Sequence, residues 1–323
     1  MTDFAILFDY QPEIVSALTK SFKKKRLVHA YLFEGQKGTR KTDAAVYLSA
    51  LLLCQSDNPP CGVCPNCLKA MNLSHGNIFI VEPENDVIKK DQIEALLHEL
   101  SSTSLFDGSR IYIIKEAHLM NAAASNALLK FLEEPHPQHY LILLSTQPHL
   151  LLDTIKSRVQ TFHFNPISKK KMTKNLTDKG IEKDIAYCLA HITSSEEEAE
   201  ELIKSGEIID IVALAKDIQK AKNKKQDLYL AFLNRGRFLF GEGILVSHHQ
   251  MFFDVLTLIV REKIKSVHGD EELFFAECLK NVDKEIETPD ELIRQLEVLN
   301  KYQERLKYHV NMELLYASMF LEF

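Results

Sequence analysis

Gly35-Gln36-Lys37-Gly38-Thr39-Arg40-Lys41-Thr42 connects a short apolar run at residues 31–34 to a helical pattern that starts at Asp43. A strand, a glycine-rich loop and a helix in this order are typical of a P-loop with the pattern G-x-x-x-x-G-K-[ST]. Backbone N–H groups of such a loop hold phosphates, and its lysine reaches the β- and γ-phosphates. Arg40 stands where the second glycine of the pattern is expected. The stretch therefore predicts a degenerate nucleotide-binding loop, whose remaining binding residues are Gly35, Gly38, Lys41 and Thr42.

Short apolar runs alternate with helical patterns through the first half of the chain. The runs lie at 30–34, 78–81, 111–114, 140–144 and 159–164, and the helical patterns near 11–25, 42–54, 89–102, 121–134 and 149–157. The runs are mostly continuous in apolar character, as in strands that are buried on both faces. Alternation of strands and helices predicts a parallel sheet with helices on both faces. The expected fold class of this half is α/β.

The second half of the chain has a helical pattern throughout. Strand-like runs stop after Pro166, short helical segments fill 168–205, and longer amphipathic segments lie near 210–240, 247–267, 271–281 and 288–321. The run Ser194-Ser195-Glu196-Glu197-Glu198 predicts an N-cap and an acidic first turn. We therefore expect three domains: an α/β domain at 1–166, a small helical domain at 167–206 and an all-α domain at 207–323.

The composition is that of an ordinary globular protein, with 323 residues and a net charge of −6. No apolar run approaches the roughly 18 residues that indicate a membrane-spanning helix. The N-terminus carries Asp3 and Asp9 where a signal peptide would be basic. The expected location is the cytoplasm, without a membrane association. The negative net charge and the lack of interleaved aromatic and basic residues argue against strong independent binding of DNA.

The cysteines at positions 54, 61, 64 and 67 form a close group in the sequence. In a cytosolic protein such spacing is typical of a metal site rather than of disulfides. Four thiolates match a closed tetrahedral zinc site, which has no open position for a catalytic water and is therefore structural. A redox-active Cys-x-x-Cys pair is the alternative. We place a zinc module at about residues 54–75, with the ligands Cys54, Cys61, Cys64 and Cys67.

The strand-like run at 110–114 ends in Lys115 and Glu116. P-loop ATPases place an aspartate after such a strand to hold Mg²⁺. An ammonium group there repels the ion, since a unit charge pair about 4 Å apart at an effective dielectric constant near 20 is worth about 4 kcal/mol. Arg40 also removes a glycine that permits close approach of the backbone to phosphate. ATP hydrolysis is not expected, ATP binding is expected to be weak, and Lys41 is left either without a role or paired with Glu116.

Further motifs accompany these features, at residues 29–35, 115–118, 126–135, 145–146 and 157–158. In this order they resemble the AAA+ clamp-loader subunits of bacterial DNA polymerase III, most specifically through Leu-Leu-Lys-Phe-Leu-Glu-Glu-Pro at 128–135. The resemblance covers about residues 1–165. It implies a RecA-like AAA+ domain with a zinc-module insertion, a helical lid and an all-α collar. It also implies a heteropentamer with the tau/gamma and delta subunits, which loads a sliding clamp on primed DNA.

Within this family the chain resembles the stator, a rigid subunit without a working ATP site. Arg40 and Lys115 depart from active subunits, and Glu197 stands where we align an arginine of the lid. Ser157 and Arg158 match the family's Ser-Arg-Cys motif, in which a valine here replaces the cysteine. The resemblance implies that Arg158 is an arginine finger acting in trans on the ATP of a neighbouring tau/gamma subunit. The alternative is an arginine at the sheet edge that pairs with an acid.

Two other functions stay open at this point. One is an active ATPase subunit of the tau/gamma type, which would bind nucleotide tightly in the presence of Mg²⁺. The other is a zinc-dependent DNA-binding module, whose affinity for DNA would fall as salt is added. Both can be distinguished from a stator by binding measurements on the isolated chain.

Overall fold

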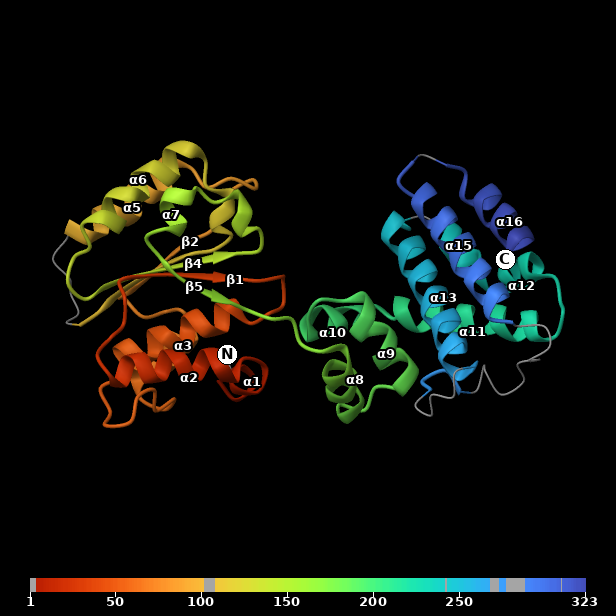
Figure 1. Ribbon diagram of the computed structural model, residues 1–323, viewed down its shortest axis with the longest axis horizontal. Helices are drawn as coiled ribbons and strands as arrows, with labels where there is room; N and C mark the ends of the chain where they lie inside the picture. Colours follow the sequence, from red (N-terminus) through yellow and green to blue (C-terminus); the bar gives the residue numbers. More distant parts are fainter. Residues whose placement is uncertain (1–3, 102–107, 242, 268–272, 277–287, 309) are drawn as a thin grey trace. The chain divides into compact units, whose positions relative to one another are not determined.

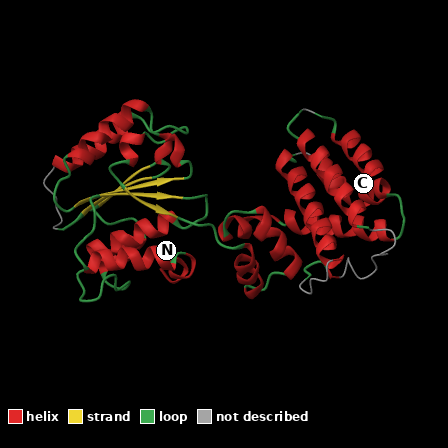
Figure 2. Cartoon of the chain, viewed as in Figure 1, coloured by secondary structure: helices red, strands yellow, loops and turns green. Residues whose placement is uncertain are grey.

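The structure is a computed structural model that describes residues 4–101, 108–241, 243–267, 273–276, 288–308 and 310–323. The chain forms two compact units, Met1–Ile167 and Ser168–Phe323, and each is described by itself. Figure 2 shows that the described strands all belong to the first unit, whereas the second is built from helices and loops. Of the described helices, none is both long and apolar enough to cross a membrane.

A five-stranded parallel sheet forms the centre of the first unit (Figure 1). Its strands are β1 (Ala30–Glu34), β2 (Ile78–Val81), β3 (Arg110–Ile114), β4 (His139–Ser145) and β5 (Gln160–His163). Their order is β2-β3-β4-β1-β5, so that β1 lies between β4 and β5. The five predicted strands and the α/β fold class are confirmed. Glu34 pairs with Ser145, which brings the carboxyl ends of β1 and β4 together.

Helices cover both faces of this sheet (Figure 1). One face is covered by α1 (Phe4–Tyr10), α2 (Pro12–Lys23), α3 (Lys41–Leu53) and α4 (Pro65–Met71), and the other by α5 (Lys90–Ser101), α6 (Ala122–Glu133) and α7 (Asp153–Lys156). Side chains of a strand alternate between the faces. Tyr31 and Phe33 of β1 accordingly join the core under α3, while Ala30 and Leu32 join the core under α6. Burial on both sides explains why the strands are continuously apolar.

Two parts of the helical prediction need correction. The segment predicted as one helix at 149–157 is a 3₁₀ turn, η2 (Pro148–Leu150), followed by the short α7. Leu151 and Leu152 between them have extended backbones, and the Leu151 side chain is buried in the core. The helices α1 and α4 are not predicted, because each has only 7 residues and shows too little of a helical period.

The second unit consists of helices, as expected for this half of the chain. They are α8 (Lys169–Asp178), α9 (Lys183–Ile192), α10 (Glu196–Ser205), α11 (Glu207–Asn223), α12 (Leu228–Arg235), η3 (Gly236–Phe240), α13 (Val246–Val267), α15 (Pro289–Arg305) and α16 (Met312–Glu322). The predicted N-cap is confirmed: the Ser195 hydroxyl accepts a hydrogen bond from Glu198 N at 3.2 Å. Most of the predicted helix at 271–281 lies outside the described residues, and a division near residue 206 stays a prediction.

An aromatic core holds the C-terminal helices together. Tyr316 of α16 is fully buried, and its ring centroid lies 4.5 Å from that of Phe232 and 5.9 Å from that of Phe253. The Tyr316 hydroxyl lies 2.8 Å from Nδ1 of His249, so its polar end is also paired. Aromatic pairs at such distances add to the free energy gained by burial. Tyr316 therefore belongs to a core and is not available to a ligand.

Candidate functional site

The nucleotide-type loop lies at the carboxyl ends of β1, β4 and β5. Its first residue, Gly35, donates its N–H to Ser145 O at 3.1 Å, which fixes the loop to β4. A Cβ atom at Gly35 would lie 2.5 Å from Phe164 O, a backbone atom directly after β5. Phe164 N in turn donates to Glu34 O at 2.7 Å, so this neighbour has little freedom to move. Gly35 is thus required by close packing as well as by its positive φ of 159°.

Gly35→Ala is expected to destabilise the first unit by about 1–3 kcal/mol, because the added methyl group overpacks the contact with Phe164. Urea unfolding followed by a probe of the first unit measures the change. Gly108→Ala is the control: Gly108 lies in the same unit and also has a positive φ, but nothing lies within 4 Å of its Cβ position. Equal losses in both variants would show that the close contact at Gly35 does not matter.

Arg40 takes up a glycine-like backbone conformation. Its φ of 67° and ψ of 25° are left-handed, which costs a non-glycine residue about 1–2 kcal/mol. The guanidinium lies 5.1 Å from the centre of the Tyr10 ring and bonds Asp43 Oδ2 through Nη1 at 3.3 Å. A cation–π contact of this kind contributes about 0.5–1 kcal/mol and so offsets part of the strain. The replacement of glycine by arginine therefore leaves the backbone path of a P-loop in place.

The Lys41 ammonium is bound to the loop itself. It donates to Gly35 O and Gln36 O, both at 2.7 Å, and its residue is only 7% exposed. Burial lowers the pKa of Lys41, and the Glu116 carboxylate opposes part of that shift. The predicted pairing with Glu116 is not found among the described contacts of Lys41, because the loop carbonyls are closer partners. The group that would reach a phosphate is thus already engaged.

A second side chain, which the sequence pattern does not reveal, also ties down the loop. The buried amide of Gln11 donates through Nε2 to Thr39 O at 3.1 Å and to Asn165 O at 2.7 Å. Gln11 precedes α2, far from both partners in the sequence. Nothing in a sequence pattern marks a glutamine between two loops, because its role depends on their proximity in the fold.

The acidic residue after β3 is part of a hydrogen-bonded network. Glu116 has a left-handed backbone, and its Oε2 accepts a hydrogen bond from Thr146 Oγ1 at 2.8 Å. His118 Nδ1 lies 3.5 Å from the same oxygen and 3.3 Å from Ser145 Oγ. Burial lowers the pKa of His118, although the Glu116 carboxylate raises it. The network joins the ends of β3 and β4 and engages Oε2 of the Glu116 carboxylate.

Lys115, at the place of the metal-binding aspartate, forms an ion pair with Glu82. Its Nζ lies 2.5 Å from Glu82 Oε1, just after β2. The ammonium is therefore compensated, and the pair joins the ends of β2 and β3. Lys115 itself has no oxygen with which to coordinate Mg²⁺, and Oε1 of Glu82 is bound to its ammonium group.

Arg158 lies between α7 and β5 and is held by three contacts. Its Nη2 lies 3.0 Å from Glu133 Oε1, and its Nη1 donates to Thr154 O at 3.0 Å and to Ser157 Oγ at 3.3 Å. The Arg158 side chain is 38% exposed and that of Glu133 is 53% exposed. The pairing with an acid, which the sequence leaves as an alternative, thus exists in this chain. It leaves Arg158 at the surface, where a neighbouring molecule could contact it.

The four cysteine sulfurs converge at the end of α3 and the start of α4. All four Sγ atoms lie within 4.8 Å of one another, and the pairs Cys61–Cys67 and Cys54–Cys64 are both 4.0 Å apart. A tetrahedral zinc ion with Zn–S bonds near 2.3 Å requires S–S distances of about 3.8 Å. The donor set therefore fits a zinc ion. No other group of three or more possible ligands is found among the described residues.

Backbone N–H groups point at several of these sulfurs, and they favour the thiolate form of Cys61. Cys64 N lies 3.4 Å from Cys61 Sγ, and Cys67 N lies 3.4 Å from Cys64 Sγ. The N–H groups of Val63 and Cys64 lower the pKa of Cys61 to about 6. Burial has the opposite effect on Cys67, whose pKa is raised. A buried thiol gives up its proton when it coordinates a metal, so the arrangement suits a cation that compensates Cys67.

The remaining predicted site residues have the following positions. Gly38 has a φ of 79° inside the loop, and Thr42 is half-buried in the first turn of α3. Ser157 donates its hydroxyl to Thr154 O at 3.1 Å and ends α7. Glu197 lies in the first turn of α10, in the second unit.

The fold and these motifs define the class. A parallel sheet of order β2-β3-β4-β1-β5, a loop of P-loop type after β1, an acidic residue after β3 and an arginine before β5 are the arrangement of a RecA-like AAA+ domain. A family model described as "DNA polymerase III, delta subunit" matches residues 10–168. The DNA polymerase III subunit delta' of Bacillus subtilis is 34% identical over 310 residues, which cover 94% of this chain and 93% of that protein. The chain belongs to the delta' family of DNA polymerase III subunits.

Two further similarities have lower sequence identity. The DNA polymerase III subunit tau/gamma of Haemophilus influenzae is 28% identical over 277 residues, which cover 84% of this chain and 39% of that protein. A solved structure of a DNA polymerase III gamma subunit-related protein from Thermotoga maritima is 17% identical, with a TM-score of 0.45, and covers 96% of this chain and 98% of its own.

Proposed function

We propose that the chain is the non-hydrolysing stator of a DNA polymerase III clamp loader. In this role it supports the ATP-dependent loading of a sliding clamp on primed DNA without an ATPase activity of its own. The observation that carries the proposal is the state of the loop: Lys41 donates to the carbonyls of Gly35 and Gln36 instead of facing an open phosphate site. Lys115, which stands at the place of the metal-binding aspartate and is paired with Glu82, offers no oxygen ligand to Mg²⁺.

The proposal extends to the partners and the location. Relatives of this chain bear the names delta' and tau/gamma, which supports an assembly with tau/gamma and delta subunits, as a heteropentamer in the cytoplasm. The three-domain division into an AAA+ domain at 1–166, a lid at 167–206 and a collar at 207–323 belongs to the same proposal. In it the collar carries the subunit contacts. Co-expression with the partner subunits and mass measurement of the intact complex tests the composition.

Arg158 is the residue through which the stator takes part in catalysis. In the proposed mechanism its guanidinium exchanges the Glu133 carboxylate for the phosphoryl oxygens of an ATP bound by a neighbouring tau/gamma subunit. An exposed ion pair of this kind contributes only about 0.2–1 kcal/mol, so the exchange costs little. Ser157 orients the guanidinium by accepting a hydrogen bond from Nη1 at 3.3 Å. The zinc ion in this proposal is structural and is held by the four cysteines, where it fixes the turn between α3 and α4.

Titration of the isolated chain with a fluorescent ATP analogue and Mg²⁺ tests the central claim. We expect no saturable binding up to the millimolar range and no turnover, since Lys41 and Lys115 are both engaged within the chain. A tau/gamma subunit under the same conditions is the positive control. Tight Mg²⁺-dependent binding with turnover would instead support an active ATPase of the tau/gamma type. Salt-sensitive binding of DNA by the isolated chain would support the DNA-binding alternative.

A further inference from the structure

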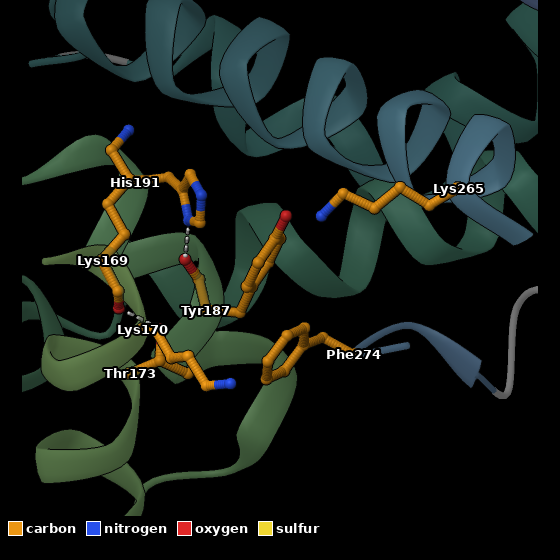
Figure 3. A pocket seen from close by; sticks show the side chains of 7 residues that line it. All are labelled: Lys169, Lys170, Thr173, Tyr187, His191, Lys265 and Phe274. Atoms are coloured by element: carbon orange, nitrogen blue, oxygen red, sulfur yellow. Dashed lines mark hydrogen bonds between the residues drawn. The ribbon is translucent and has the colours of Figure 1, made fainter. Parts of the chain in front are cut away.

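A cavity of about 310 Å³ lies in the second unit (Figure 3). It is formed by the first turns of α8, by α9, by the end of α13 and by the short segment that contains Phe274. Its lining consists of Lys169, Lys170, Thr173, Tyr187, His191, Lys265 and Phe274. The volume is at the lower end of the range of about 300–1,000 Å³ for small-molecule sites.

The lining is strongly positive. Of the described residues that line the cavity, three are lysines and none is acidic. The ammonium groups of Lys169 and Lys265 have no ion-pair partner among the described residues, and that of Lys265 lies 5.8 Å from the centre of the Tyr187 ring. Figure 3 shows the Lys265 side chain extending towards Tyr187, and the Lys169 side chain running along the other side of His191. An anion placed here would meet two ammonium groups that have no ion-pair partner in the part of the chain that the structure describes.

The position of the lysines on α8 strengthens this argument. Ser168 is the N-cap of α8, and Lys169, Lys170 and Lys171 follow it directly. The N-terminus of a helix carries a partial positive charge, so acidic residues are favoured there and basic ones are disfavoured. The helix terminus and the lysines therefore add to the same positive potential. Such an arrangement lowers stability by itself and is relieved when an anion binds.

The positive surroundings of the cavity affect the protonation of the His191 ring. Its Nδ1 bonds Tyr187 O at 2.8 Å, which leaves Nε2 as the nitrogen available for a ligand. Burial lowers the pKa of His191, and Lys169, Lys265 and Arg261 lower it further, although the bond to Tyr187 O opposes them. The buried carboxylate of Glu262 accepts the N–H groups of Phe274 and Phe275 at 2.7 and 3.2 Å, so it supports the wall of the cavity.

The aromatic rings restrict the kind of anion. Tyr187 is stacked on Phe274 with 4.3 Å between ring centroids and 14° between planes, and the His191 ring centroid lies 4.2 Å from that of Tyr187. Recognition of single-stranded nucleic acid by stacking needs an exposed aromatic face for each base. Tyr187 offers no such face here. The cavity therefore suits a compact anion rather than a flat base.

We propose that this cavity binds a phosphate group through Lys169, Lys265 and His191. Lysine is well suited to phosphate because its ammonium acts as a mobile point charge with three donors. The phosphate comes either from a small free phosphate compound or from the backbone of a nucleic-acid strand that passes the second unit. The inference does not depend on the stator proposal, because it uses no residue of the first unit.

The test uses the full chain at constant ionic strength. Inorganic phosphate, pyrophosphate and an oligothymidylate are titrated separately while the ring resonances of His191 are followed by NMR. We expect saturable shifts with at least one ligand, and the three arms distinguish a free phosphate from a strand. In the double variant K169Q/K265Q the affinity should fall about tenfold or more, since hydrogen bonds to charged groups are strong. Lys174→Gln, which removes the same charge from α8 outside the cavity, should leave the affinity unchanged.

Two results would overturn the proposal. One is an absence of saturable binding, or an equal loss in the Lys174 control, which would indicate unspecific attraction to a positive surface. The other concerns Asp270, Glu271 and Glu272, which stand before Phe274 in the sequence and lie outside the described residues. These three residues can be replaced by Asn, Gln and Gln. If phosphate bound only after that replacement, the lysines would be the ion-pair partners of this chain's own carboxylates. Circular dichroism of each variant checks that it is folded.

Discussion

Replacement of Arg158 by alanine is expected to slow ATP hydrolysis at the neighbouring tau/gamma site that it faces by roughly 10³–10⁵-fold. The physical reason is charge: a guanidinium stabilises the negative charge on the transferring phosphoryl group, an effect equivalent to about 4–7 kcal/mol of activation free energy. Single-turnover hydrolysis by the assembled loader measures the change, because the site that lacks the arginine no longer contributes to the fast phase of ATP hydrolysis. Sites that do not face Arg158 should continue at their ordinary rate.

Two further variants test whether the effect is specific to the guanidinium group of Arg158. Arg158→Lys retains the charge but loses the planar pair of donors, so it should recover only a small part of the rate. Lys156→Ala is the control, since it removes an exposed cation of α7 that pairs with Asp153 at 2.7 Å and not with Glu133. Unchanged hydrolysis in the Arg158→Ala loader, with a complex of unchanged mass, would mean that Arg158 serves only the surface ion pair with Glu133.

Loss of a zinc ligand is expected to have the second large effect. Zinc binding to peptide sites of this type provides about 10–16 kcal/mol of apparent free energy, and Cys64→Ser removes one of four ligands. Residues 54–75 should then lose protection from hydrogen exchange, while the strands of the sheet stay protected. The zinc content, measured by mass spectrometry of metals, should fall from one ion per chain towards none. The loss should remain local, because the sheet has its own cores on both faces.

A different thiol provides the control for the zinc experiment. Cys188 is fully buried in α9 and lies outside the four-sulfur group. Cys188→Ala should therefore keep one zinc ion per chain and the protection of residues 54–75. A chain that contains no zinc at all, with a protected segment 54–75, would show that the turn between α3 and α4 does not need a metal.

The sequence predicts the sheet well because each strand has a local signal. Continuous apolar runs such as 78–81 reflect burial on both faces, and the structure places Ile78–Val81 between the helices as β2. Likewise, the spacing of the cysteines already predicts a group of sulfurs, since the two turns that join them are short. In both cases the decisive contacts are close in sequence or repeat with a regular period.

The contacts that define the state of the site are not local. Lys41 is an exception: it is predicted to lack a role or to pair with Glu116, but its partners are the carbonyls of its own loop, six and five residues away. Lys115 is paired with Glu82, which is 33 residues away in sequence, and Thr146 reaches Glu116 from another strand. No period or motif marks such partners. They follow only from the order of the strands, which brings the ends of β2, β3 and β4 to one edge.

The left-handed backbone of Arg40 has a consequence for how subunits of one family can differ. Because the chain follows the path of a glycine there, an active and an inactive loop can share one backbone and be exchanged through side chains alone. Subunits that hydrolyse ATP and subunits that do not can then fit the same place in a ring without a change in the dimensions of the domain. If the loop does not hydrolyse ATP, as proposed, the backbone that it presents to the assembly need not differ from that of an active subunit.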